Sequence, residues 1–194
     1  MKKLLALFSV ISLLTVINCT KQSDLKPDIV DKKIIVKEIF KAGMSWNSQF
    51  NSLKSTYPID VDLDTIMPGP EGGNIHILGS ITGSMELDDV NMNVLGGTLT
   101  LGLTETISDY AFFYDGKKFT MNGAPSITSN GTFFLIPGGA FGSESSMQLS
   151  GGIRVTGPNY DKTVNVQVTV NINADGRGGN VSGKIGGDPV NFTF

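Results

Sequence analysis

An unbroken alternation of apolar and polar residues over residues 163–173 constrains the fold more than any other stretch of this sequence. Valine or isoleucine stands at every second position, and threonine, asparagine or glutamine stands between them. Because successive side chains of a β-strand point to opposite faces of a sheet, we expect a half-buried strand here. Its core face is aliphatic and consists of Val164, Val166, Val168, Val170 and Ile172.

Shorter versions of the same pattern recur through the chain after Pro58. Short turns containing glycine or proline separate them, and Asp115-Gly116 is the clearest hairpin signal among these. Strands joined by short turns are antiparallel neighbours, because parallel strands need long crossovers. We therefore predict an all-β fold, an antiparallel meander of about ten strands that is strongly curved or closed into a barrel. The expected strands are residues 59–64, 74–87, 99–103, 107–114, 117–122, 126–136, 147–155, 163–173, 181–186 and 190–194.

Two glycines, Gly79 and Gly83, lie inside the strand expected over residues 74–87. An interior glycine weakens a strand unless it permits a bend or the close approach of another backbone. We interpret both as points where the sheet curls.

The apolar period changes near the N-terminus of the domain. Ile35 and Ile39 are four residues apart, and Trp46, Phe50 and Leu53 follow at spacings of four and three. This spacing predicts one or two short helices interrupted at a glycine and packed on the sheet. A strand is the alternative for residues 33–40. The two aromatic residues, Trp46 and Phe50, are also the candidate ligand contacts. We favour simple packing of their rings on the sheet, because exposed aromatic rings are unfavourable.

The first 19 residues have the organisation of an export signal. Lys2 and Lys3 precede an apolar stretch over residues 4–17, which is too short for a permanent membrane span. The segment LTVINC, which ends at Cys19, resembles the lipobox of bacterial lipoproteins. The resemblance covers roughly a tenth of the chain. It implies export, cleavage before Cys19, and acylation of that cysteine as the attachment to the outer membrane, on its periplasmic or its surface side.

Three segments follow from this resemblance and from composition. Residues 1–18 are the expected signal peptide, residues 19–31 a polar, lipid-anchored flexible tether, and residues 32–194 a single β domain that begins with a helical segment. Cys19 is the only cysteine, so no disulfide within the chain and no cysteine-based metal site is expected. Without the two lysines of the signal, 13 basic residues stand against 18 acidic ones with no basic cluster, which argues against a nucleic-acid partner.

The acidic residues of segment 60–71 occupy its first, third, fifth and twelfth positions, a spacing that resembles the calcium loop of EF-hand proteins. However, Thr65 stands where that loop needs glycine, and Pro68 lies in its second half. Alternating aspartates are also typical of the solvent face of a strand. We favour the solvent face and expect no metal or other cofactor, with calcium as the alternative. The four candidate ligands are Asp60, Asp62, Asp64 and Glu71.

Catalytic signatures are sparse in this sequence. His76 is the only histidine, and no Gly-x-Ser-x-Gly motif accompanies it. Carboxylate pairs catalyse glycoside hydrolysis, but sequence spacing does not establish the separation that such a pair needs. We expect a protein that is not an enzyme, with a carboxylate-based hydrolase as the remaining alternative. The candidate acids for such a pair are Glu86, Asp88, Asp89, Glu105 and Asp109.

Three classes of function are compatible with these observations. The first is an envelope-anchored lipoprotein whose β domain has a binding or structural role, with the membrane as one partner and an envelope protein or an apolar ligand as another. The second is a carrier that holds an apolar or amphipathic ligand in a barrel cavity, entered near residues 46–53. The third is an integral outer-membrane barrel. The oligomeric state is open.

Overall fold

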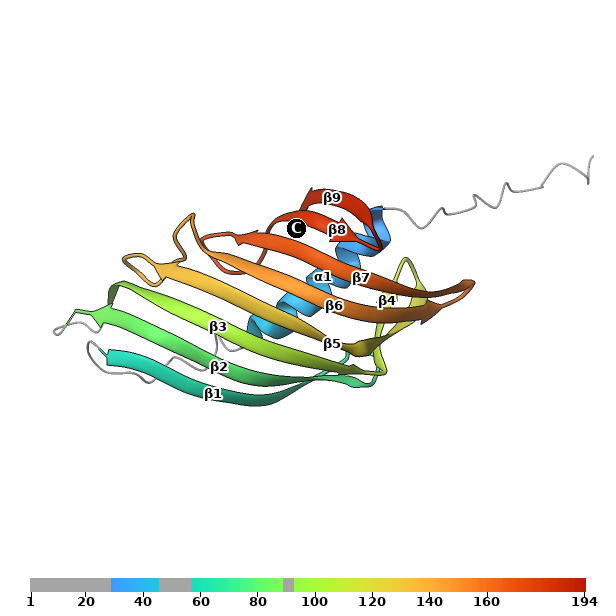
Figure 1. Cartoon of the computed structure of the whole chain (residues 1–194), viewed down its shortest axis with the longest axis horizontal. Coiled ribbons are helices and arrows are strands. Elements are labelled where there is room, and N and C mark those ends of the chain that lie inside the picture. Colours follow the sequence, from blue (N-terminus) through green and yellow to red (C-terminus); the bar gives the residue numbers. More distant parts are fainter. Residues whose placement is uncertain (1–28, 46–56, 89–92) are drawn as a thin grey trace, which may run out of the picture.

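One antiparallel sheet makes up most of the computed structural model, which describes residues 29–45, 57–88 and 93–194 (Figure 1). The expected signal peptide, Cys19, Trp46, Phe50 and Leu53 lie outside the described residues. The predicted all-β class and antiparallel meander are confirmed: the strands are paired in the order β1-β2-β3-β5-β6-β7-β8-β9, with β4 beside β5. The strands are β1 (Tyr57–Pro68), β2 (Asn74–Leu87), β3 (Val94–Ser108), β4 (Tyr110–Tyr114), β5 (Lys117–Leu135), β6 (Ser146–Gly157), β7 (Tyr160–Ile172), β8 (Gly179–Ile185) and β9 (Asp188–Thr193).

Over the described residues the sheet has nine strands, where about ten are expected from the sequence. The difference arises in β5, because the segments 117–122 and 126–136, expected as two strands, form one. β5 pairs with β6 on both sides of an irregularity between Gly123 and Ile127, where the register shifts. A strand that keeps the same partner on either side of such a bulge continues through it.

The sheet is not closed or strongly curled. Within the described residues, β1 pairs only with β2, and β9 pairs only with β8, so these two strands form its edges. The described strands therefore form an open meander, and neither the strong curvature nor the closed barrel of the prediction is seen.

Helix α1 (Ile29–Gly43) lies across one face of the sheet, at an angle to the strands (Figure 1). Ile35 and Ile39 are buried together with Val36 and Phe40, as the spacing of four predicts. The helix is therefore confirmed, and the alternative of a strand over residues 33–40 is wrong. Over the part of the chain that the structure describes, no helix is long and apolar enough to cross a membrane.

Contacts at both ends of α1 fix it on the sheet. Near its start, the Lys32 ammonium donates a hydrogen bond of 2.6 Å to an Asp188 carboxylate oxygen of β9. Farther along, the Phe40 ring packs edge-on against Phe194, with the ring centroids 5.4 Å apart. The helix ends at Gly43, as its sequence predicts. We call the sheet face under α1 the inner face and the opposite one the outward face.

The aliphatic side of β7 is core, as the alternation predicts. Val166, Val168 and Val170 are buried, and Val164 is half-buried, whereas Gln167 is exposed on the outward face. The inner face of the sheet and the apolar side of α1 thus enclose one continuous hydrophobic core.

Gly79 and Gly83 permit the close approach of a neighbouring backbone, one of the two roles open to an interior glycine. Their φ angles are +152° and +150°, a region that side-chain-bearing residues rarely adopt. A Cβ atom at Gly79 would lie 2.0 Å from the carbonyl oxygen of Gly102 in β3. The curl expected at these glycines is not seen, because the sheet is not strongly curled.

We expect Gly79→Ala to lower the free energy of unfolding by at least about 2 kcal/mol, since it combines backbone strain with a clash against backbone. Gly102→Ala is the matched control, because a Cβ there meets no atom closer than 3.7 Å and its φ is ordinary. The control should stay within about 0.5 kcal/mol of wild type. Urea denaturation of both variants measures these changes. If Gly79→Ala lowered the free energy of unfolding no more than Gly102→Ala does, β2 would not need glycine at this position.

Candidate functional site

A shallow hollow of about 430 Å³ lies on the outward face of the sheet and crosses β2, β3, β5 and β6. Strand pairing arranges most of its lining as two neighbouring rows, each with one residue from every strand. Ser80, Gly102, Asn130 and Gln148 stand side by side in the first row, and Thr82, Thr100, Thr132 and Ser146 in the second. We call this hollow the polar trough, and its lining is Ser80, Thr82, Thr100, Leu101, Gly102, Asn130, Gly131, Thr132, Ser146 and Gln148.

Gly102 explains why the outward face is hollowed here. It stands between Ser80 of β2 and Asn130 of β5, and it carries no side chain where its neighbours do. The nearest atom to a Cβ at this position would be the Asn130 Oδ1 at 3.7 Å. The space above Gly102 is therefore open, and larger side chains surround it.

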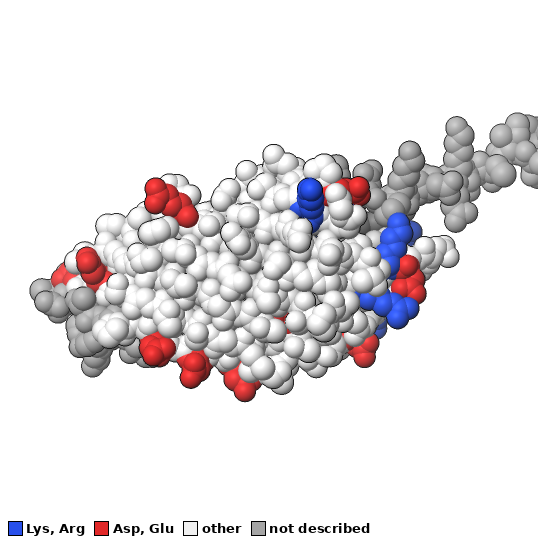
Figure 2. Space-filling model, in the orientation of Figure 1, with Lys and Arg blue, Asp and Glu red and all other residues white. Residues whose placement is uncertain are grey.

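The trough is polar and uncharged. Seven of its side chains carry hydroxyl or amide groups, and none of the seven takes part in a hydrogen bond with another described residue. Figure 2 shows the same face, on which acidic and basic side chains lie mostly toward the margins and the middle is free of them. The trough thus offers hydrogen-bond donors and acceptors to the solvent without an electrostatic preference for either sign of charge.

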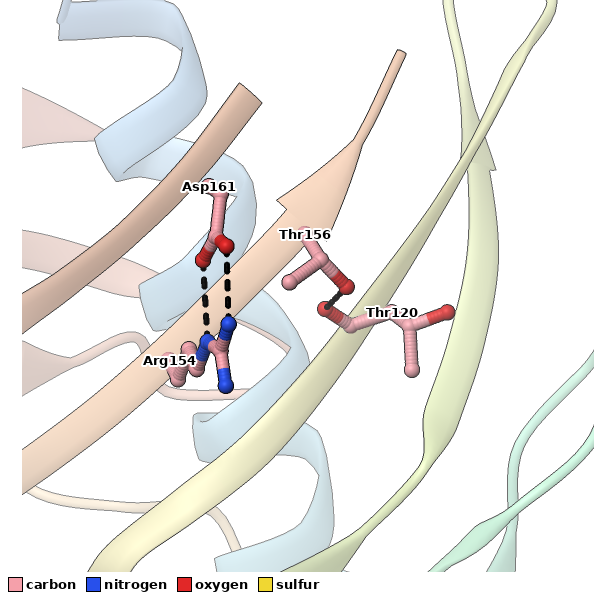
Figure 3. A network of polar contacts seen from close by, with 4 residues as sticks. All are labelled: Thr120, Arg154, Thr156 and Asp161. Atoms are coloured by element: carbon pink, nitrogen blue, oxygen red, sulfur yellow. Dashed lines mark hydrogen bonds and ion pairs between the residues drawn. The ribbon is translucent and has the colours of Figure 1, made fainter. Parts of the chain in front are cut away.

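One basic residue of the outward face, Arg154 on β6, is paired with Asp161 on β7 (Figure 3). Its Nε and Nη2 donate to the two carboxylate oxygens at 2.9 and 2.7 Å. These bonds raise the pKa of Arg154 and lower that of Asp161. Beside the pair, the Thr156 hydroxyl donates to the Thr120 carbonyl oxygen at 3.5 Å and links β6 to β5. The pair adds no net charge to this face.

A second polar group lies on the inner face, where β3 places Glu105 in the core. Its side chain is fully buried, and the Ser129 hydroxyl of β5 donates to Oε1. The other oxygen, Oε2, has no hydrogen-bond partner among the described residues. Burial raises the pKa of Glu105 to about 8, although the Ser129 hydrogen bond acts in the opposite direction. The group is therefore mainly a neutral acid at pH 7.

The end of α1 closes over Glu105. A Cβ at Gly43 would lie 3.1 Å from Oε1, so the helix backbone comes close to the carboxyl group. Glycine at the helix end thus has a packing role that its sequence context does not reveal. Glu105 has no access to solvent in this arrangement, and a substrate outside the protein would not reach it.

A further buried contact joins α1 to β4. The Tyr110 hydroxyl donates to Glu38 Oε2 at 2.7 Å, and Lys41 lies 3.5 Å from the same oxygen. Burial and the nearby carboxylate raise the pKa of Tyr110 above its ordinary value. The sequence analysis did not identify this pair. A glutamate on the apolar side of the helix, next to Ile39, was the available signal.

The acidic candidates for calcium lie in a strand and not in a loop. Asp60, Asp62 and Asp64 are exposed on β1, and Glu71 lies in the turn that follows. His76 of β2 contacts Asp64, with 2.7 Å between Nε2 and Oδ1. No group of three or more histidine, cysteine or acidic side chains in the described ranges is placed to hold a metal ion. The interpretation as the solvent face of a strand fits this placement.

The acids considered for hydrolysis are dispersed. Glu86 is exposed on β2, and Asp109 is engaged with Asn122, whose Nδ2 donates to Asp109 Oδ1 at 3.1 Å. Asp88 is half-buried beyond the end of β2, and Asp89 lies outside the described residues. Glu105 is the buried acid described above.

The space between α1 and the sheet is filled by side chains. An apolar hollow beside the helix measures only about 10 Å³, which is barely the volume of one water molecule. A drug-sized ligand would need several hundred cubic ångströms. Residues that line the hollow are Ile34, Ile35, Phe112, Tyr114, Phe119, Val155 and Tyr160.

No family model, curated protein or solved structure matches this chain. Its function is therefore inferred from the N-terminal sequence and from the geometry of the two sheet faces.

Proposed function

We propose that this protein is an exported lipoprotein, anchored to the outer membrane through an acylated Cys19, whose β domain binds a ligand or partner without catalysing a reaction. The polar trough is the observation that carries the binding role. Seven side chains that have no hydrogen-bond partner among the described residues line one hollow of the outward face. On the inner face, by contrast, Glu105 and Ser129 are buried and bonded to each other.

The absence of catalysis is part of the proposal and has its own support. A carboxyl group acts on a substrate only where the substrate can reach it, and Glu105 is fully buried under α1. The imidazole of His76 contacts Asp64 on an exposed edge of the sheet, away from any hollow described above. Neither group lies in the polar trough.

The two other functions have less support. A carrier needs a cavity, which a closed barrel would supply, whereas the apolar hollow beside α1 measures only about 10 Å³. Entry of an apolar ligand near Trp46 and Phe50 stays a prediction. An integral barrel needs an apolar outward face toward lipid, and the outward face here is lined with serine, threonine, asparagine and glutamine.

The anchor is tested by membrane fractionation of Cys19→Ala. We expect the wild-type protein to remain with the membranes after a carbonate wash and the variant to be released, because acylation of Cys19 is the proposed attachment. Ser23→Ala, a substitution in the same tether, is the matched control and should fractionate as the wild type does. Retention of Cys19→Ala in washed membranes would contradict the anchor.

A further inference from the structure

We infer that the polar trough binds a neutral glycan chain that lies across β2, β3, β5 and β6. The inference rests on the proposed binding function and adds the chemical class of the ligand. It depends on the shape of the trough, on the absence of charge there, and on the kind of hydrogen-bonding groups in its two rows.

The shape of the trough fits an extended segment. Four neighbouring strands span roughly 14 Å, since strands lie about 4.8 Å apart. The two rows run across the strands and not along one of them, so each of the four strands supplies at least one hydroxyl or amide group. A polymer laid across the sheet would meet a hydroxyl or amide group at each step. A compact ligand would use only part of a hollow of about 430 Å³.

The chemistry of the rows matches hydroxyl groups. Serine and threonine hydroxyls both donate and accept, and the neighbouring amides of Asn130 and Gln148 each supply a donor and an acceptor. Sugar hydroxyls likewise do both, and two on adjacent carbons can bond the two ends of one amide. No other described residue forms a hydrogen bond with these seven side chains.

Other ligand classes fit the trough less well. An anion would find no lysine or arginine in the lining, and a cation would find no carboxylate. An apolar ligand would remove water from seven polar groups without replacing its hydrogen bonds, which is unfavourable. Sheets that pack face to face in a second copy do so through interdigitating apolar side chains, whereas the side chains in the two rows of the trough are polar. A neutral, hydroxyl-rich chain meets none of these objections.

Binding can be measured by capture of the mature, detergent-solubilised protein on insoluble polysaccharides. The neutral probes are cellulose, β-1,3-glucan, mannan and cross-linked dextran, and the acidic probes are immobilised alginate and heparin. We expect saturable capture on at least one neutral probe and none on the acidic ones. Because the trough is uncharged, raising the salt concentration should leave capture unchanged.

Variants then locate the site. Gly102→Ile should fill the trough and weaken capture about tenfold or more, the loss that follows from roughly two missing hydrogen bonds. Thr106→Ile is the matched control on the same outward face of β3, outside the lining, and should bind as wild type does. Asn130→Leu provides a second test in which the backbone of β3 is unaltered. Thermal unfolding of each variant verifies the fold.

Four outcomes would overturn the inference: capture by none of the neutral probes, capture only by acidic probes, equal weakening by Gly102→Ile and Thr106→Ile, or dimers that Gly102→Ile dissociates. These outcomes leave the anchor untouched, because fractionation of Cys19→Ala is measured independently. Failure of the glycan inference and failure of the anchor can thus be told apart.

Discussion

The free energy of unfolding is expected to fall as the pH rises from about 4.5 to about 8, and Glu105→Gln should remove most of that fall. The pKa of an ordinary glutamate side chain is 4.5, and the pKa of Glu105 in the folded protein is raised to about 8. The folded state therefore holds the proton more tightly than the unfolded state does. The resulting stabilisation is complete below pH 4.5 and is lost as the pH rises through 8. Its full size is on the order of 5 kcal/mol, a large fraction of the stability of an ordinary domain.

Glutamine is an informative replacement because it has the shape of the neutral acid and can still accept the Ser129 hydrogen bond. Glu86→Gln, an exposed position on β2, is the control and should keep the wild-type pH dependence. The pKa values of Asp161 and Asp188 are lowered by Arg154 and Lys32, so these groups act on stability at more acidic pH. Urea denaturation at pH 5, 6.5 and 8.5 would provide the measurement. An unchanged pH slope in Glu105→Gln would show that another group carries it.

Val168→Asp should unfold the domain or destabilise it by several kcal/mol, because the new carboxylate would be buried without a partner. Val168 is only 4 % exposed and lies between Leu149 of β6 and Gly183 of β8. Its neighbour Gln167 is on the outward face opposite Lys184. Even with a second lysine there, Gln167→Lys should stay within about 0.5 kcal/mol of wild type. Thermal unfolding measures both, and equal shifts would refute the facing of β7.

The sequence predicted those parts of the fold that depend on local periodicity. The strict alternation in β7 identified its core face, and the spacing of Ile35 and Ile39 identified α1. Gly79 and Gly83 were predicted to mark a curl of the sheet, whereas the structure shows that they permit close approach of the β3 backbone. Alternation alone does not specify how a buried face is covered, because a helix and a closed barrel both remove it from water. The open sheet was therefore not predictable in this way.

The candidate site depends on information that no single strand contains. The polar side of each strand could be predicted, including Gly102 between threonines on β3. The lateral alignment of Ser80, Asn130 and Gln148 with that glycine is set by the register of three strand pairs, which periodicity does not determine. Glu105 had a readable signal, because it continues the apolar series of Leu101 and Leu103. A carboxylate in such a series indicates burial, whereas Glu105 was predicted only as one of several acids that could form a pair.

The two edges of the open sheet also affect the self-association of this protein. An unpaired edge can add a strand from another molecule and so begin a fibril. Three aspartates along β1 place repeated negative charge at one edge, which a like edge would repel. β9 is short and contains Pro189, which lacks the N–H that an added strand would need. Charge at one edge and proline at the other thus protect an open sheet from edge-to-edge polymerisation.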